Sequence, residues 1–380
     1  MLNRYKRQLK SHWLNIRSKR HPDQLVIFES DDWGSIRTPS LKAFNSLKDQ
    51  GAVDADWSYA KYDCLASNSD LERLFDLLLG FQDTVGNSPV ITANVITANP
   101  NFDKIRQHDY SAYFWEPLED TLQRYPEHNR LLSLWRTGIE GGVFFPQFHG
   151  REHVNVARWL RLLQAGDKHV RAGFEHYSFS VTPEKKAEKT SFLPAALDYD
   201  HPDDLPLILA SLEEGMQQFR SLFGAEAKTF TAPNYTWDTA VEDVMTEQGI
   251  TIFQSSRVQH YPTPELPQNE KRFHYTGQTA TGGARYIVRN CQFEPSTRKF
   301  REKELENCLR EVALAFKYKT PAVISTHRLN FVGAIDQANA DLNLLLFRQL
   351  LQQLLQRWPG LKFATSREVF AMDYSSSLTG

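Results

Sequence analysis

Short apolar segments rich in β-branched residues alternate with amphipathic segments of helical period along most of this chain. The predicted strands are 25–30, 89–96, 142–148, 169–181, 228–233, 250–255, 285–293 and 321–327. The predicted helices are 71–79, 153–163, 205–223, 238–248, 303–316 and 338–358. Apolar strands that alternate with helices indicate a parallel sheet whose two faces are both covered. Seven or eight such units predict an α/β fold, a distorted (β/α) barrel that is closed or nearly closed.

The length of the chain suits one barrel with loop insertions. Single α/β barrels commonly take about 200–250 residues, and this chain has 380. We therefore expect one catalytic domain over residues 21–375. Two stretches are predicted as insertions: 97–127, which is rich in aromatic residues, and 257–284, which contains the Pro-rich run YPTPELPQNEKRF.

Charge and cysteine content exclude several classes of protein. The chain has 44 Lys and Arg against 46 Asp and Glu, so we expect no nucleic-acid partner. Cys64, Cys291 and Cys308 have neither a disulfide pattern nor the spacing of a cysteine zinc site, which favours a reducing compartment. No apolar run reaches the length of about 18 residues that a membrane span needs, and no secretory signal is recognisable. We expect a cytoplasmic protein.

The first 20 residues carry seven basic side chains and no acidic one. Apolar residues lie at helical spacing among them: Leu2, Tyr5, Leu9, Trp13 and Ile16. This pattern predicts a basic amphipathic helix over residues 1–20. Such a helix either packs against its own domain or makes a reversible, peripheral contact with an anionic membrane.

Unusual polar residues follow several predicted strands. Asp31 and Asp32 follow the first strand, His149 follows the third, and His327 ends the last. In (β/α) barrels, reactive groups lie at the C-terminal ends of the strands, where the loops converge. We therefore expect these side chains to share one site.

The spacing of the histidines and carboxylates favours a metal centre. His149 and His153 are four residues apart, and on one helical turn both imidazoles would face the same metal ion. Without a metal, they are two polar residues in a strand–helix loop. Adjacent carboxylates such as Asp31 and Asp32 repel each other unless a cation or a shared proton compensates, although an Asx-turn also explains many such pairs. A lone His327 is commonly a hydrogen-bonded structural residue, but beside the other two motifs it becomes a catalytic candidate.

Together these motifs resemble those of the polysaccharide deacetylase family, carbohydrate esterase family 4. Asp31-Asp32 resembles the first motif of the family, and HGREH at 149–153 resembles its second motif, His-(Ser/Thr)-x-x-His. The run TAPNY at 231–235 resembles the third motif only in its Pro and Tyr, and STH at 325–327 resembles the fifth. The order of the motifs is that of the family, and their span covers most of the chain.

The chain also departs from the family pattern. Gly150 replaces the hydroxyl residue of the second motif, and Thr231 or Ala232 stands near the place of the third-motif arginine, which orients the catalytic Asp in the family. The Asp and Trp of the fourth motif are not found; the run ITIFQSSRVQ occupies that strand. The candidates to replace the missing arginine are Arg37, Arg257, Arg289 and Arg328.

The resemblance implies a metal-dependent hydrolase that removes acetyl groups from an N- or O-acetylated sugar or polysaccharide precursor. It assigns one divalent ion to Asp32, His149 and His153, and this ligand set favours zinc, with cobalt, nickel, iron or manganese as alternatives. It makes Asp31 the base and His327 the acid. We expect Trp33, Tyr235, Arg328 and Asn330 at the substrate, and a backbone N–H near Tyr235 as an oxyanion donor.

Two other functions are compatible with the sequence. HGREH also fits His-x-x-Glu-His, the inverted zinc-peptidase motif, in which Glu152 would be the base. That motif needs both histidines within a helix and leaves Asp31, Asp32 and His327 unused. Loss of the third and fourth motifs is also compatible with a catalytically inactive, carbohydrate-binding barrel.

Overall fold

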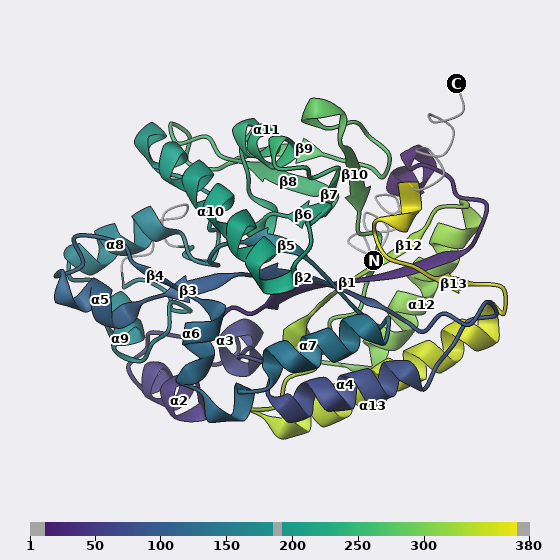
Figure 1. Ribbon diagram of the computed structural model, residues 1–380, viewed down its shortest axis with the longest axis horizontal. Coiled ribbons are helices and arrows are strands. Elements are labelled where there is room, and N and C mark those ends of the chain that lie inside the picture. The colour runs from purple at the N-terminus through teal and green to yellow at the C-terminus, as the bar shows by residue number, and fades with distance from the viewer. Residues whose placement is uncertain (1–11, 185–191, 371–380) are drawn as a thin grey trace.

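The centre of the molecule is a parallel sheet that curls into a half-barrel (Figure 1). The computed structural model describes residues 12–184 and 192–370. Eight strands follow one another in the order β10-β7-β6-β5-β2-β1-β12-β11, and β13 pairs with β1. Their bounds are β1 Leu25–Trp33, β2 Ile91–Ile96, β5 Phe144–Gly150, β6 Thr229–Thr231, β7 Ile252–Ser255, β10 Arg285–Val288, β11 Cys291–Gln292, β12 Ala322–His327 and β13 Lys362–Phe363. The predicted distorted (β/α) barrel is confirmed, although the sheet forms a half-barrel and not the closed or nearly closed barrel that was expected.

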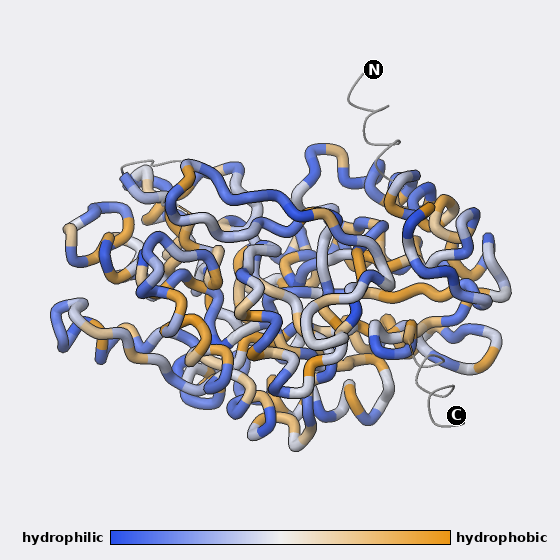
Figure 2. The backbone as a smooth tube through the Cα atoms, turned by 90° about the horizontal axis from the view of Figure 1, so that it is seen from above, coloured by the Kyte–Doolittle hydropathy of each residue, from blue (hydrophilic) through white to orange (hydrophobic). Residues whose placement is uncertain are grey.

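Helices cover the outer face of the sheet in two groups. The helices are α2 Leu41–Asp49, α3 Ser58–Tyr62, α4 Asn68–Leu79, α5 Phe102–Gln107, α6 Leu118–Gln123, α7 Leu131–Glu140, α8 Val156–Gln164, α9 Lys168–Glu175, α10 Leu205–Phe223, α11 Thr239–Glu247, α12 Glu302–Lys317 and α13 Gln337–Arg357. In Figure 1, α4, α7, α12 and α13 lie on one side of the strands and α10 and α11 on the other. Each group buries its own apolar cluster against the sheet. Hydrophilic loops lie along much of the outline of the molecule (Figure 2).

The alternation of side chains along β1 determines where its polar residues point. Val26 and Phe28 face the helices and belong to the large outer cluster, whereas Ile27 faces the interior of the half-barrel. Because successive side chains of a strand point to opposite faces, Glu29 and Asp31 continue the inner row. The inner row of β1 therefore changes from apolar to acidic toward its C-terminal end.

Both predicted insertions contain a pair of antiparallel strands. In the first, β3 Ala98–Pro100 pairs with β4 Trp115–Pro117. In the second, β8 Val258–Tyr261 pairs with β9 Glu270–Phe273. The first strand pair adjoins a separate apolar cluster that packs α2, α5, α8 and α9 together beside the barrel.

One predicted strand is wrong: residues 169–181 do not form a strand and instead begin with helix α9. Asp167 caps this helix, since its side chain accepts a hydrogen bond from the Val170 amide. Val170 and Phe174 lie four residues apart and are both buried in the cluster beside the barrel. The β-branched and aromatic content of the segment therefore reflects a short, buried helix face.

The predicted N-terminal helix lies partly outside the described residues, which begin at residue 12. Residues 12–17 are helical. Leu14 packs against the barrel, whereas Trp13 and Ile16, which belong to the predicted apolar stripe, are 39% and 60% exposed. Within the described part of the chain, no helix is long and apolar enough to cross a membrane.

Gly34 should be required for the turn that follows β1. Its φ is +86°, and a Cβ atom at this position would lie 2.3 Å from the Ile96 carbonyl oxygen. Gly34→Ala should lower the free energy of unfolding by more than about 2 kcal/mol, because backbone strain and the clash add. Gly86→Ala is the matched control: Gly86 has φ +88° but nothing within 4 Å of its Cβ position, so only about 1 kcal/mol of strain is expected. Urea unfolding of both variants measures the difference, and equal losses would contradict this account.

Candidate active site and metal centre

The two adjacent carboxylates reach one pocket because β1 is irregular at its end. Ser30 pairs with Ala93 and Trp33 pairs with Val95, so Asp31 and Asp32 together oppose the single residue Asn94. Asp32 has a φ of +76°. A β-bulge of this kind re-aims side chains at the rim of a sheet. Asp31 and Asp32 can therefore both line the pocket, which a regular strand would not allow.

A second irregularity places His149 at the same pocket. Val95 of β2 pairs with Phe148 of β5, and Ile96 pairs with Gly150, so His149 has no counterpart on β2. Gly150 has a φ of +127°, which residues with a Cβ rarely adopt. This backbone geometry explains why residue 150 is a glycine, whereas the motif His-(Ser/Thr)-x-x-His has a hydroxyl residue at this position.

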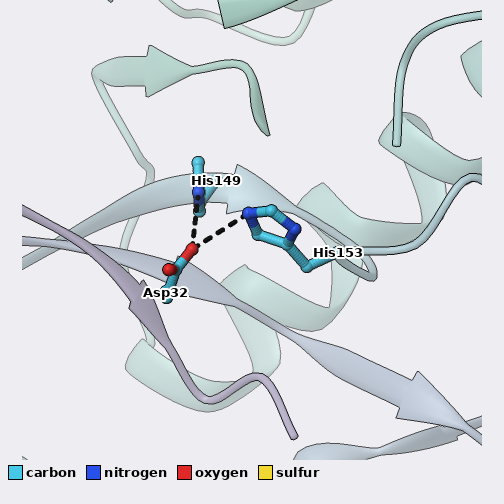
Figure 3. A group of neighbouring side chains, drawn as sticks. All are labelled: Asp32, His149 and His153. Atoms are coloured by element: carbon cyan, nitrogen blue, oxygen red, sulfur yellow. Dashed lines mark ion pairs between the residues drawn. The ribbon is translucent and has the colours of Figure 1, made fainter. Parts of the chain in front are cut away.

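His149 and His153 meet, although not on a helical turn as the sequence analysis expects. His149 lies in β5, and His153 lies in the loop before α8, which begins at Val156. Nevertheless, donor atoms of Asp32, His149 and His153 all lie within 4.8 Å of one another (Figure 3). Asp32 Oδ1 is 2.9 Å from His153 Nε2 and 3.5 Å from His149 Nε2.

These three buried side chains fit a divalent metal ion. His149 Nδ1 donates to the Thr231 carbonyl, 2.7 Å away, so Nε2 is the ring nitrogen that remains for a metal ion. That Nε2 atom is buried and has no hydrogen-bond partner among the described residues. Burial lowers the pKa of His153, which keeps this imidazole neutral. One carboxylate and two imidazoles are ligands that zinc and similar ions accept, with positions left open for water or substrate.

Arg37 holds the other oxygen of Asp32. Its Nη2 atom lies 3.1 Å from Asp32 Oδ2. Although burial acts to raise the pKa of Asp32, Arg37 and His153 lower it well below its ordinary value. Asp32 is therefore ionised, with Oδ1 left to face the two histidines.

Asp31 is held by a different arginine, Arg289, which follows β10. Arg289 Nη1 and Nη2 lie 2.5 and 2.7 Å from the two oxygens of Asp31, and Asn94 donates to Oδ1 at 2.6 Å. Burial acts to raise the pKa of Asp31, but the charge and hydrogen bonds of Arg289 lower it below its ordinary value. Of the four candidates for the missing arginine, Arg289 is the one that contacts Asp31 in this way.

Arg289 is itself fixed by groups on the inner face of the barrel. Its Nε atom donates to Glu29 at 2.7 Å, and its Nη1 atom donates to the Tyr235 hydroxyl at 2.7 Å. Burial raises the pKa of Glu29 despite this arginine, and Ser366 donates to its second oxygen at 2.6 Å. Glu29 and Asp31 are two residues apart on β1, so one guanidinium bridges both acids.

His327 is paired with Glu294, a residue that the sequence analysis missed. His327 Nδ1 is 2.5 Å from Glu294 Oε1, and His327 Nε2 is 3.6 Å from Asp31 Oδ2. Burial alone would lower the pKa of His327, but Glu294 raises it to about 9. Glu294 follows the predicted strand 285–293 directly, so the strand-end rule that selected His327 could also have found it.

The proposed reacting groups line one cavity of about 290 Å³. The titratable and metal-ligating residues that line it are Asp31, Asp32, Arg37, Tyr59, His149, His153, Tyr235 and His327. Its remaining lining consists of Trp57, Phe192, Ala232, Asn234, Gln292 and Ser325. The cavity is therefore lined by charged side chains together with aromatic and amide side chains.

Three residues expected at the substrate do not line this cavity. Trp33 is buried in the outer core and donates to Ser30 Oγ at 3.0 Å. Arg328 is fully buried, and its Nε atom donates to Asp63 at 2.9 Å. Asn330 donates to Glu294 at 2.7 Å, so it supports the partner of His327.

The backbone near Tyr235 differs from the expected oxyanion donor. The Tyr235 amide donates to the Ala232 carbonyl at 3.0 Å, and the Thr236 amide donates to the Pro233 carbonyl at 3.2 Å. Both N–H groups are therefore already used in the turn that follows β6.

The geometry does not fit the inverted zinc-peptidase motif. His149 lies in a strand, whereas that motif places both histidines in a helix. Glu152, the base in that interpretation, pairs with Arg151 at 2.5 Å and accepts from the Tyr113 hydroxyl at 3.3 Å. Glu152 is not among the residues that line the cavity.

Comparisons with known proteins give structural likeness only. No family model matches the chain, and no curated protein matches it. A putative polysaccharide deacetylase from Mycobacterium smegmatis is similar with a TM-score of 0.45 and 10% identity, over 95% of this chain and 94% of that one. A pseudoenzyme of carbohydrate esterase family 4 from Bacillus anthracis gives 0.37 and 9%, over 92% and 66%.

The structural likeness extends to a sugar-transferring enzyme. A 4-α-glucanotransferase from Thermococcus litoralis gives a TM-score of 0.43 and 12% identity. The match covers 92% of this chain but only 38% of that one.

Glu294 should control the protonation of His327. In the metal-free chain, His327 should titrate with a pKa of about 9, so it is protonated at neutral pH and loses its proton only as the pH rises through that value. In Glu294→Gln the pKa should fall to about 6.5 or below, because burial then acts without the main opposing charge. NMR titration of histidine-labelled protein measures this, with the His327 signal assigned from its loss in His327→Ala. An unchanged pKa in Glu294→Gln would contradict the pairing.

Proposed function

We propose that this chain is a metal-dependent deacetylase that acts on an N- or O-acetylated sugar or polysaccharide precursor. The observation that carries the proposal is that a candidate metal site and two separate charged pairs lie at one cavity. Asp32, His149 and His153 form a candidate metal site, while Asp31 with Arg289 and His327 with Glu294 form two separate charged pairs beside it.

The metal ion that fits this site best is zinc, with cobalt, nickel, iron or manganese as alternatives. When bound, such an ion would polarise an acetyl carbonyl and increase the acidity of a nearby water molecule. Asp32 would present one oxygen to it, because Arg37 holds the other. The hydrogen bond from His149 Nδ1 to Thr231 would keep its Nε2 atom aimed at the same point.

Asp31 would take the proton of the attacking water. Arg289 binds both of its oxygens, and this two-point contact fixes the plane of the carboxylate as well as its charge. An ionised carboxylate of low pKa is a weak base, so it can deprotonate only a water molecule that has become more acidic. A metal ion would lower the pKa of the water in this way, which is why such a base would need a metal site beside it.

His327 would protonate the leaving nitrogen or oxygen of the sugar. The carboxylate of Glu294 keeps it in the imidazolium form at neutral pH and orients Nε2 toward the cavity, on the side of Asp31. Hydrolysis of an amide or ester requires a proton acceptor when water attacks and a proton donor when the leaving group departs.

The remaining lining of the cavity suits a carbohydrate. Trp57, Tyr59 and Phe192 supply apolar ring faces, and Asn234 and Gln292 supply amides that can donate to and accept from hydroxyl groups. An acetylated sugar presents both kinds of surface. Acetate release from a panel of N- and O-acetylated sugars therefore tests the proposal, and a chain that binds metal and sugar without releasing acetate would be the inactive barrel instead.

The histidine ligands can be tested by metal content. Wild-type protein should bind one divalent ion per chain, and His149→Ala and His153→Ala should lose it because two ligands bind too weakly. His327→Ala should keep its metal and release acetate about 10²–10⁴-fold more slowly, and His176→Ala should be unaffected in both respects. Elemental analysis and acetate release measure these outcomes. Full metal occupancy in both ligand variants would refute the site.

The two aspartates should respond differently to added metal. Asp31→Asn keeps the shape of the side chain but removes the proton acceptor, so acetate release should collapse while metal content stays unchanged. Asp32→Asn should weaken metal binding, and excess metal should restore part of its activity. Rescue of Asp31→Asn by metal, without rescue of Asp32→Asn, would reverse the assigned roles.

A further inference from the structure

A second cavity, of about 230 Å³, lies at the N-terminal end of strand β10, away from the catalytic residues. It is lined by Arg17, Lys19, Arg285, Tyr275, Thr276, Gly277 and Phe370. Three of these residues are basic, and no acidic residue is among the described residues that line it. We propose that this basic pocket binds the phosphate group of an anionic phospholipid and docks the protein on a membrane surface.

The basic pocket is built into the fold by the pairing of two distant segments. The Lys19 amide donates to the Thr276 carbonyl at 2.7 Å, and the Thr276 amide donates to the Ser18 hydroxyl at 3.3 Å. Gly277 has a φ of +93°, and a Cβ atom there would lie 2.8 Å from the Cβ of Lys19. The glycine thus permits the close approach that holds the basic side chains on one concave surface.

Aromatic rings, and not carboxylates, surround the guanidinium of Arg17. It lies 4.7 Å from the ring centre of Tyr275 and 5.2 Å from that of Trp13. Arg285 donates to the Thr279 hydroxyl. Within residues 12–184 and 192–370, neither arginine is in an ion pair. Arginines with no carboxylate partner retain their capacity for charge-assisted hydrogen bonds to phosphate oxygens.

Exposed apolar side chains beside the basic pocket favour a lipid over a free phosphate. Trp13 and Ile16 lie on the helical segment that leads to Arg17, and both are substantially exposed. Leu14 supplies the contact with the barrel instead. A tryptophan and an aliphatic residue next to basic side chains are typical of segments that lie in the membrane interface.

The position of the pocket also sets the orientation of the docked protein. Arg285 is the first residue of β10, and Arg289, which binds Asp31, follows its last residue. Four residues of strand separate the two sites by about 13 Å. Docking through the N-terminal end of β10 would leave the catalytic cavity open to water, and this inference does not depend on the reaction catalysed there.

Vesicle binding by the full-length chain tests the proposal. Wild-type protein should sediment with vesicles of three parts phosphatidylcholine to one part phosphatidylglycerol, and not with phosphatidylcholine alone. The Arg17→Gln/Arg285→Gln double variant should bind about 30-fold more weakly, since each basic side chain at an anionic surface contributes roughly fivefold. Arg136→Gln, an exposed arginine on α7, is the matched control and should bind within twofold of wild type.

The outcomes separate the basic pocket from general charge and from free phosphate. Equal binding by the double variant and the wild type would overturn the proposal, as would an equal loss in Arg136→Gln. Trp13→Ser/Ile16→Ser should weaken vesicle binding with its circular dichroism unchanged; unweakened binding would remove the membrane role. If inorganic phosphate binds in calorimetry at matched ionic strength and the vesicles do not, the pocket takes a free phosphate and the lipid assignment is wrong.

Discussion

The site depends on two irregularities that meet on either side of strand β2. A regular strand would send Asp31 and Asp32 to opposite faces of the sheet, because side chains alternate. The bulge in β1 sets both against Asn94, and the irregularity in β5 leaves His149 unmatched between Val95 and Ile96. A hydrogen bond from Asn94 to Asp31 links β2 to the bulged end of β1. Both irregular strand ends therefore pair with β2, and this pairing places their polar side chains at the same cavity.

Buried charge is the second constraint, and the chain meets it by pairing every buried acid of the site with a cation. Asp32 is paired with Arg37, Glu294 with His327, and Asp31 and Glu29 share Arg289. Removing one partner of such a pair leaves an uncompensated charge, which costs far more than a surface ion pair contributes. Asp31 and Asp32 contact different arginines, which is what allows the proposed mechanism to give them different roles.

The local pattern of the sequence was enough to predict the barrel and the residues at its rim, but not the contacts between distant segments. Asp31, Asp32, His149 and His327 follow from strand ends alone. Arg289 could only be one of four candidates, since its contact with Asp31 joins residues 258 positions apart. The spacing of His149 and His153 predicts that they meet, but it does not distinguish a helical turn from the bulged strand and loop that are observed. The composition of residues 169–181 predicts a strand where a helix forms, because apolar and aromatic content is similar in a buried strand and a short buried helix.

The central claim is that Asp32, and not Asp31, shares a metal ion with the two histidines. Anomalous diffraction at the zinc edge, on crystals of the zinc-loaded chain, tests this most directly. The account predicts one peak at about 2.0–2.2 Å from an oxygen of Asp32 and from Nε2 of His149 and His153, with Asp31 still bound to Arg289. A peak coordinated by Asp31 or His327, or by neither histidine, would contradict it.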